Sequence, residues 1–143
     1  MKLIALSLIC SIQLFAISKQ SIKEHAADFT NYPSTILAIA GVESTYGKNI
    51  LGDDGKSLGM MQLQVRTVYF IAKRDQSLAW LLHIPRKTLE TLLLRNDALS
   101  IQIASKLFEY YRKRYGYFTA ISKYNGGIHN YTYYNKVMKE MKR

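Results

Sequence analysis

Apolar residues recur three and four positions apart along most of the chain, and no stretch alternates strictly between apolar and polar residues. The first spacing is that of one face of a helix, whereas strict alternation would indicate a half-buried strand. Glycine and proline are scarce and fall between the helix-like stretches. With 143 residues the chain is long enough for one domain with its own core. The pattern therefore predicts a single all-α domain.

Turn and cap signals divide this pattern into helices. A first helix is expected before the break Asn-Tyr-Pro-Ser, and Ser34 is a suitable cap for a second helix that reaches Glu43. A glycine-rich loop follows, and Pro85 separates two later helices. Asp97 is expected to cap a long helix that Gly116 ends. Apart from the second helix, the expected ranges are about 22–29, 60–74 (helix or turn), 77–84, 86–95, 98–115, 117–124 and 133–143.

The N-terminus has the pattern of a secretory signal peptide. One lysine precedes an apolar run that is too short for an ordinary membrane span, and Ala16 and Ser18 are small residues at the spacing that signal peptidase requires. We expect a signal peptide over 1–18, a mature domain over 19–143 and a periplasmic or secreted protein; an uncleaved anchor is the alternative. The only cysteine, Cys10, lies inside the run, so the mature protein needs no disulfide.

Glu43 is the most informative charged residue of the chain. Ile36, Ile39, Ala40 and Glu43 are spaced 3, 4 and 3 apart, so they share one face of the second helix. A charge on an apolar face is costly unless it is paired, neutralised or used. A carboxyl group in an apolar pocket keeps its proton to higher pH and can act as a general acid. The alternative is a glutamate near a helix end that rotates into water.

Two later segments carry polar groups suited to a sugar ligand. In Ser-Leu-Gly-Met-Met-Gln, Ser57 and Gln62 can bind hydroxyl and acetamide groups, and Gly59 allows the backbone to approach a ligand. In Lys-Tyr-Asn-Gly-Gly, Tyr124 can place a hydroxyl beside a carboxyl group, and Asn125 can orient or cap. Taken singly, the methionines are ordinary core residues and Asn-Gly-Gly is an ordinary turn.

In this order, the three motifs resemble the lytic transglycosylase domain of the soluble type, in the lysozyme-like superfamily. Glu43-Ser44 matches the family's Glu-Ser motif, residues 59–62 match its Gly-(Leu/Met)-Met-Gln motif, and residues 124–126 match its Tyr-Asn-x-Gly motif. The resemblance covers about residues 32–137. Two positions depart from it: Lys123 replaces an alanine, and Tyr134-Asn135 stands for a tyrosine-valine pair.

The resemblance implies a lysozyme-like helical domain and a reaction with one catalytic carboxylate. Glu43 would protonate the β-1,4 bond between N-acetylmuramic acid and N-acetylglucosamine, then act as base while a 1,6-anhydro ring closes. No cofactor is implied. Asp53 and Asp54 are interpreted as turn residues in Gly-Asp-Asp-Gly. The substrate-binding residues that the resemblance implies are Ser57, Met61, Gln62, Tyr124 and Asn125.

Two alternatives remain open. A hydrolytic muramidase would share the fold and the glutamate but need a second acid, for which Asp53 and Asp54 are the candidates. A non-catalytic wall-binding component of a secretion or conjugation apparatus would not need Glu43.

The formal net charge of +10 favours an anionic partner. Peptidoglycan carries peptide and lactyl carboxylates and fits this charge, whereas no nucleic-acid-binding motif is present. The three histidines lie far apart in sequence and form no metal-binding pattern. We therefore expect a monomer that acts on peptidoglycan strands, with a cell-envelope secretion or conjugation apparatus as a further candidate partner, and no metal or cofactor.

Overall fold

The computed structural model describes residues 17–143, so nearly all of the predicted signal peptide lies outside the described residues. Helices dominate these residues, which confirms the predicted all-α class. No helix within them is both long and apolar enough to cross a membrane. The helices are α1 (Lys19–Ala27), α2 (Pro33–Ser44), α3 (Val65–Ala72), the 3₁₀ helix η2 (Gln76–His83), α4 (Arg86–Arg95), α5 (Asp97–Tyr115), α6 (Tyr117–Tyr124) and α7 (Tyr131–Glu140).

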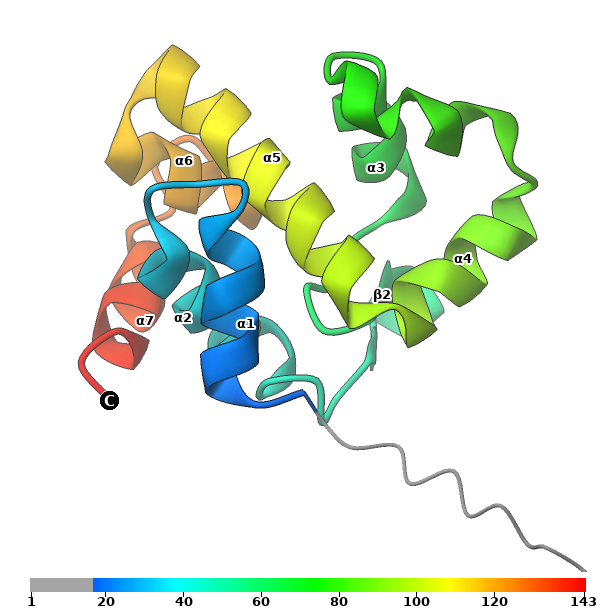
Figure 1. Cartoon of the computed structure of the whole chain (residues 1–143). Coiled ribbons are helices and arrows are strands. Elements are labelled where there is room, and N and C mark those ends of the chain that lie inside the picture. The colour runs from blue at the N-terminus through cyan, green and yellow to red at the C-terminus, as the bar shows by residue number, and fades with distance from the viewer. Residues whose placement is uncertain (1–16) are drawn as a thin grey trace, which may run out of the picture.

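The long helix α5 is the centre of the fold. In Figure 1 it crosses the molecule diagonally, with α1, α2, α6 and α7 on one side and α3 and α4 on the other. It packs directly against α1, α2, α3, α4 and α6. On this helix Ile101, Ala104, Leu107 and Phe108 are buried, and Tyr111 is half-buried beside them. The helix therefore joins the two sides of the molecule through one continuous core.

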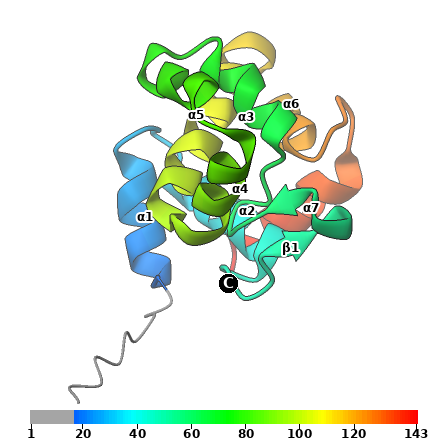
Figure 2. The same cartoon turned by 90° about the vertical axis from the view of Figure 1, so that its right-hand side faces the viewer.

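The glycine-rich loop contains a small β-hairpin that the sequence pattern did not indicate. Strand β1 (Leu51–Gly52) pairs antiparallel with β2 (Ser57–Leu58), and the one-turn helix η1 (Asp53–Gly55) joins them (Figure 2). Each strand has only two residues, too few for an alternating pattern to be visible. The Asp-Gly signal did locate the turn, where Asp53 and Asp54 have left-handed backbones with φ of 50° and 54°.

Several helix boundaries differ from the expected ones because other residues form the caps. Helix α2 has Pro33 at its first position, so Ser34 lies inside the helix and not at its cap. The cap of α5 is Asn96, whose side chain accepts a hydrogen bond of 2.9 Å from the backbone N–H of Leu99. Asp97 is the first residue of that helix. Two neighbouring polar residues thus competed for one cap, and the sequence alone did not separate them.

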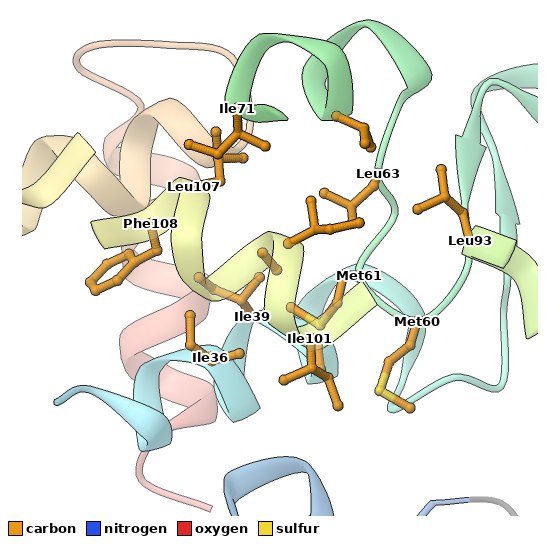
Figure 3. Packing of buried hydrophobic residues seen from close by; sticks show 14 of the residues in the cluster. Ile36, Ile39, Met60, Met61, Leu63, Ile71, Leu93, Ile101, Leu107 and Phe108 are labelled. Atoms are coloured by element: carbon orange, nitrogen blue, oxygen red, sulfur yellow. The ribbon is translucent and has the colours of Figure 1, made fainter. Parts of the chain in front are cut away.

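Of the helix or turn expected from about residue 60, the turn comes first, and the helix begins only at Val65. Before it, residues 59–64 form a tight turn, in which Leu58 and Leu63 pair as an isolated bridge. Met60, Met61 and Leu63 are buried there, and Figure 3 draws them among the core side chains. These residues are buried in a turn and not in a helix, and the apolar run alone does not distinguish the two.

Candidate active site

Glu43 lies one residue before the end of α2, at the edge of the core. Ile36, Ile39 and Ala40 on the same helical face are fully buried, as predicted, and Glu43 is only partly exposed. The helix ends there because Thr45 adopts a left-handed backbone with φ of 53°. The stripe thus brings the carboxyl group from the core to the surface at one point.

The surroundings of Glu43 raise the pKa of its carboxyl group to near neutral pH. Burial raises the pKa of Glu43 from its ordinary 4.5 to about 7. The hydroxyl of Tyr133 donates a hydrogen bond of 2.5 Å to Glu43 Oε1, which lowers the pKa, and the charge of Asp53 raises it. A carboxyl group of this pKa is present in both forms near pH 7, as a group that first gives and then takes a proton requires.

A cleft of about 260 Å³ opens beside Glu43. It is formed by segments that are far apart in the sequence: the end of α2, the β-hairpin, the start of α3, α5 and the end of α6. Its polar and charged lining residues include Glu43, Asp53, Ser57, Gln62, Gln64, Arg66, Lys123, Tyr124 and Asn125. The structure therefore brings four of the five predicted substrate-binding residues to the same cleft as Glu43.

A second hollow of about 210 Å³ is also lined by Glu43. Glu43 and Asn125 line both hollows, and Asn130, Tyr133 and Lys136 complete much of the second one. Glu43 therefore lies where two hollows meet. We call the two hollows together the groove.

Met61 is the predicted site residue that the structure places elsewhere. Its side chain is fully buried and belongs to the core, so it does not line the groove (Figure 3). Its backbone carbonyl accepts a hydrogen bond of 2.8 Å from the hydroxyl of Tyr124. Tyr124 thus lines the cleft, while its hydroxyl group binds the protein backbone. Burial raises the pKa of that hydroxyl well above its ordinary value.

Gly59 also has a different role from the predicted one. Its φ is +74°, and a Cβ atom there would stand 1.9 Å from the carbonyl oxygen of Leu93. Only glycine fits this position, because the end of α4 packs against the turn. The close approach expected for a ligand is therefore made by the protein's own backbone.

Ser44 and Gln62 hold the second motif against the end of α2. Ser44 Oγ donates to the carbonyl of Met60 at 2.6 Å and accepts from the N–H of Gly47 at 2.7 Å. The amide of Gln62 donates to the carbonyls of Asn49 and Gly59 at 3.2 and 3.0 Å. These hydrogen bonds hold the residues beside Glu43 and those near position 60 next to each other in the folded protein.

Sequence reasoning missed Tyr133, which lies on α7 and is nearly fully buried. The resemblance pointed to Tyr134-Asn135 instead, but the ring of Tyr134 packs on Phe118 with 4.7 Å between ring centroids. A signal was present, since Tyr133 and the buried Val137 are four residues apart on one helical face. Tyr133 is therefore the tyrosine that contacts the candidate acid.

Asp53 has a turn role, as predicted, but its carboxylate also faces the cleft. It accepts hydrogen bonds from Ser57 Oγ and, at 3.3 Å, from Gln64 Nε2. The loop thus holds this carboxylate in place despite its glycines. Asp54 lines neither part of the groove.

Lys123, the first departure from the family pattern, also reaches the cleft. Its Nζ lies 5.1 Å from the ring centroid of Tyr111 and 5.0 Å from that of Tyr115. These rings hold the ammonium group by cation–π attraction. The substitution therefore adds a positive charge to the cleft beside Tyr124.

Comparison with known proteins identifies the family of the chain. Within residues 17–143, no three histidine, cysteine or acidic side chains come together in a way that could hold a metal ion. No curated protein and no solved structure gave a significant match. A family model, described as the transglycosylase SLT domain, matches residues 20–143. The match covers almost all of the chain, so this protein belongs to the transglycosylase SLT domain family.

Proposed function

We propose that the protein is a peptidoglycan lytic transglycosylase that forms 1,6-anhydromuramic ends. Membership of the family supports a transglycosylase-type activity on peptidoglycan in general. The observation that carries the finer proposal is the position of Glu43, a half-buried carboxyl group with a pKa of about 7 at the junction of two hollows.

In the proposed reaction Glu43 acts twice. The protonated carboxyl group gives its proton to the glycosidic oxygen, and the bond from that oxygen to the anomeric carbon of N-acetylmuramic acid breaks. The substrate's own acetamide eases the positive charge on the sugar. The carboxylate then removes the proton of the muramic 6-hydroxyl, whose oxygen bonds to the anomeric carbon and closes the anhydro ring. The proton returns to Glu43, and no water is consumed.

Tyr133 and Asp53 would tune this cycle from opposite sides. The hydroxyl of Tyr133 stabilises the carboxylate form of Glu43 after the first proton transfer. The negative charge of Asp53 favours the protonated form before that transfer. The sugar rings would lie along the groove, against Tyr124, Asn125 and the hairpin residues Ser57 and Gln62.

A second candidate function is hydrolysis by a muramidase. The observation in its favour is that the carboxylate of Asp53 faces the cleft and is held by Ser57 and Gln64. Such a carboxylate could activate a water or stabilise the sugar cation, as second carboxylates do in glycosidases.

Mass spectrometry of digested peptidoglycan separates the two candidates. The lytic reaction gives anhydro ends, whereas hydrolysis gives reducible muramic ends. Under the lytic proposal Asp53→Asn keeps most of the activity and the anhydro products, and the control Asp54→Asn behaves like the unchanged protein. A large loss in Asp53→Asn, together with reducible ends from the unchanged protein, would favour hydrolysis.

We also propose that the protein is exported, with cleavage after Ser18, and acts as a monomer in the periplasm or outside the cell. The motivation is the short apolar run that ends in Ala-Ile-Ser. N-terminal sequencing of protein from the envelope fraction should give Lys19 as the first residue. An intact Met1 in a cytosolic fraction would reject this.

A further inference from the structure

A third hollow, of about 440 Å³, adjoins the active-site cleft and is strongly basic. It lies between the hairpin turn, the start of α3 and the start of α4. Its lining residues are Lys56, Gln64, Val65, Arg66 and Arg86. We call it the basic hollow. It carries three cationic residues and no acidic one, and Gln64 and Arg66 also line the cleft beside Glu43.

The cations of the basic hollow are available to a ligand. In the described part of the chain, Lys56 and Arg66 make no ion pair, and Arg86 pairs only with Glu90, at 2.9 Å between two exposed side chains. An exposed pair of this kind is weak and easily exchanged. The 460 Å³ hollow beside α5 is different, because its Lys106 and Arg112 are paired with Asp75 and Glu109.

The wall between the basic hollow and the cleft is fixed. The amide of Gln64 donates to Asp53 Oδ2 at 3.3 Å and to Ser57 Oγ at 3.2 Å, which sets the side chain between the two spaces. The buried Val65 anchors the start of α3 behind it. A ligand in the cleft can therefore extend past Gln64 and meet Arg66 first, then Lys56 and Arg86.

We propose that the basic hollow binds the carboxylates of a stem peptide carried by the same glycan strand whose sugars lie in the groove. The inference rests on the proposed function, because it takes the strand in the groove to be peptidoglycan. The ligand must be anionic and must be attached to the sugars in the cleft, and a stem peptide on a muramic acid meets both conditions. Guanidinium groups also match carboxylates in a two-pronged geometry that suits recognition. The enzyme thereby prefers peptide-bearing strands to bare ones.

The test uses a double variant, Lys56→Gln with Arg86→Gln, because neither residue lines the groove. Both changes are made in protein that also carries Glu43→Gln, so that the substrate is not cut during the measurement. Binding is measured by calorimetry. The probes are soluble glycan strands that carry tetrapeptides and the same strands after an amidase has removed the peptides. The control double variant is Lys48→Gln with Lys87→Gln, which loses the same charge at exposed positions outside the three hollows.

We expect the test variant to bind peptide-bearing strands roughly fivefold to tenfold more weakly, since each exposed ion pair contributes a few-fold. Its affinity for bare strands should equal that of the control. Added salt should shrink the difference on peptide-bearing strands, because the charges are exposed. Equal losses on both strands, no loss on either, or the same loss in the control would overturn the inference.

Failure of the proposed function is read separately. The protein with Glu43 intact is incubated with both kinds of strand, and a lack of cleavage products from either rejects the proposed function. The binding measurements still report whether the hollow distinguishes the two strands. Thermal melting verifies that each variant is folded, and the single variants Lys56→Gln and Arg86→Gln replace the double variant if it is not.

Discussion

At Glu43, burial and hydrogen bonding act on the same carboxyl group in opposite directions, and burial prevails. The pKa of the folded state is about 7 and that of the unfolded chain is the ordinary 4.5, so the folded protein binds more protons between these values. The contribution of Glu43 to the free energy of unfolding should therefore be greatest below pH 4.5 and fall as pH rises to 7, by up to about 3 kcal/mol. At neutral pH the buried carboxyl group thus lowers the free energy of unfolding.

Glu43→Gln should remove this cost and the activity together. Gln keeps the shape but cannot donate the proton, so turnover should fall by a factor on the order of a hundred or more. Relative to the unchanged protein, the variant should gain stability as pH rises, by up to about 3 kcal/mol at pH 8. Urea unfolding at pH 4.5 and pH 8 measures this. A stability difference that does not change with pH, or near-normal turnover, would contradict the assignment.

Tyr133→Phe should shift the pH dependence of the reaction. The hydroxyl lowers the pKa of Glu43, so its loss should raise that pKa and move the alkaline limb of the rate profile to higher pH. The maximal rate should also fall, by roughly tenfold to a hundredfold, because the carboxyl group is less well positioned. The matched control is Tyr134→Phe, whose ring packs on Phe118. An unshifted profile in Tyr133→Phe would show that the hydroxyl does not act on Glu43.

At the scale of elements, the contact between α4 and the turn at residues 59–64 holds the cleft in shape. Gly59→Ala should be severely destabilising, by about 3 kcal/mol or more, because its Cβ would stand 1.9 Å from the carbonyl oxygen of Leu93 and its φ is +74°. Gly55→Ala is the control. Its φ is similar, +82°, but nothing lies within 4 Å, so only backbone strain of about 1 kcal/mol is expected. Equal melting temperatures for the two variants would mean that the close packing is not needed.

The elements that sequence could predict are those whose own residues dictate them. The apolar stripe of α2 and the stop of α5 at Gly116 follow from local spacing and backbone freedom, and both are present. The hairpin could not be predicted, because its two-residue strands depend on each other and on Leu63. The contact from Tyr133 to Glu43 joins residues 90 apart, and no local rule gives such a distance. The features that could not be predicted from the sequence therefore depend on tertiary contacts.

At the scale of the whole molecule, the groove exists because distant segments meet around α5. The end of α2 supplies the acid, α7 supplies its hydrogen-bond donor, and the hairpin and α6 supply the walls. Tyr46 ties α2 to α7 a second time, through a hydrogen bond to Glu140. A change that loosens one of these elements should therefore disturb the site without touching it.

A change in the N-terminal helix α1 is of this kind, because α1 packs against both α2 and α5. Ser18 caps it by accepting a hydrogen bond of 3.0 Å from the N–H of Ser21, and Ile17 packs against the core. Cleavage after Ser18 would remove both residues and put a positive amino group at the helix start, which the helix dipole disfavours.

The protein that begins at Lys19 should therefore be less stable than one that begins at Ile17, by about 1 to 2 kcal/mol, or about 3 to 8 °C in melting temperature. Ser18→Ala in the longer protein should reproduce about half of this loss, because it removes the cap and keeps Ile17. Thermal melts of the three proteins measure both effects. If all three melt together, neither the cap nor Ile17 supports the domain, and cleavage at Ser18 would leave the folded enzyme unchanged.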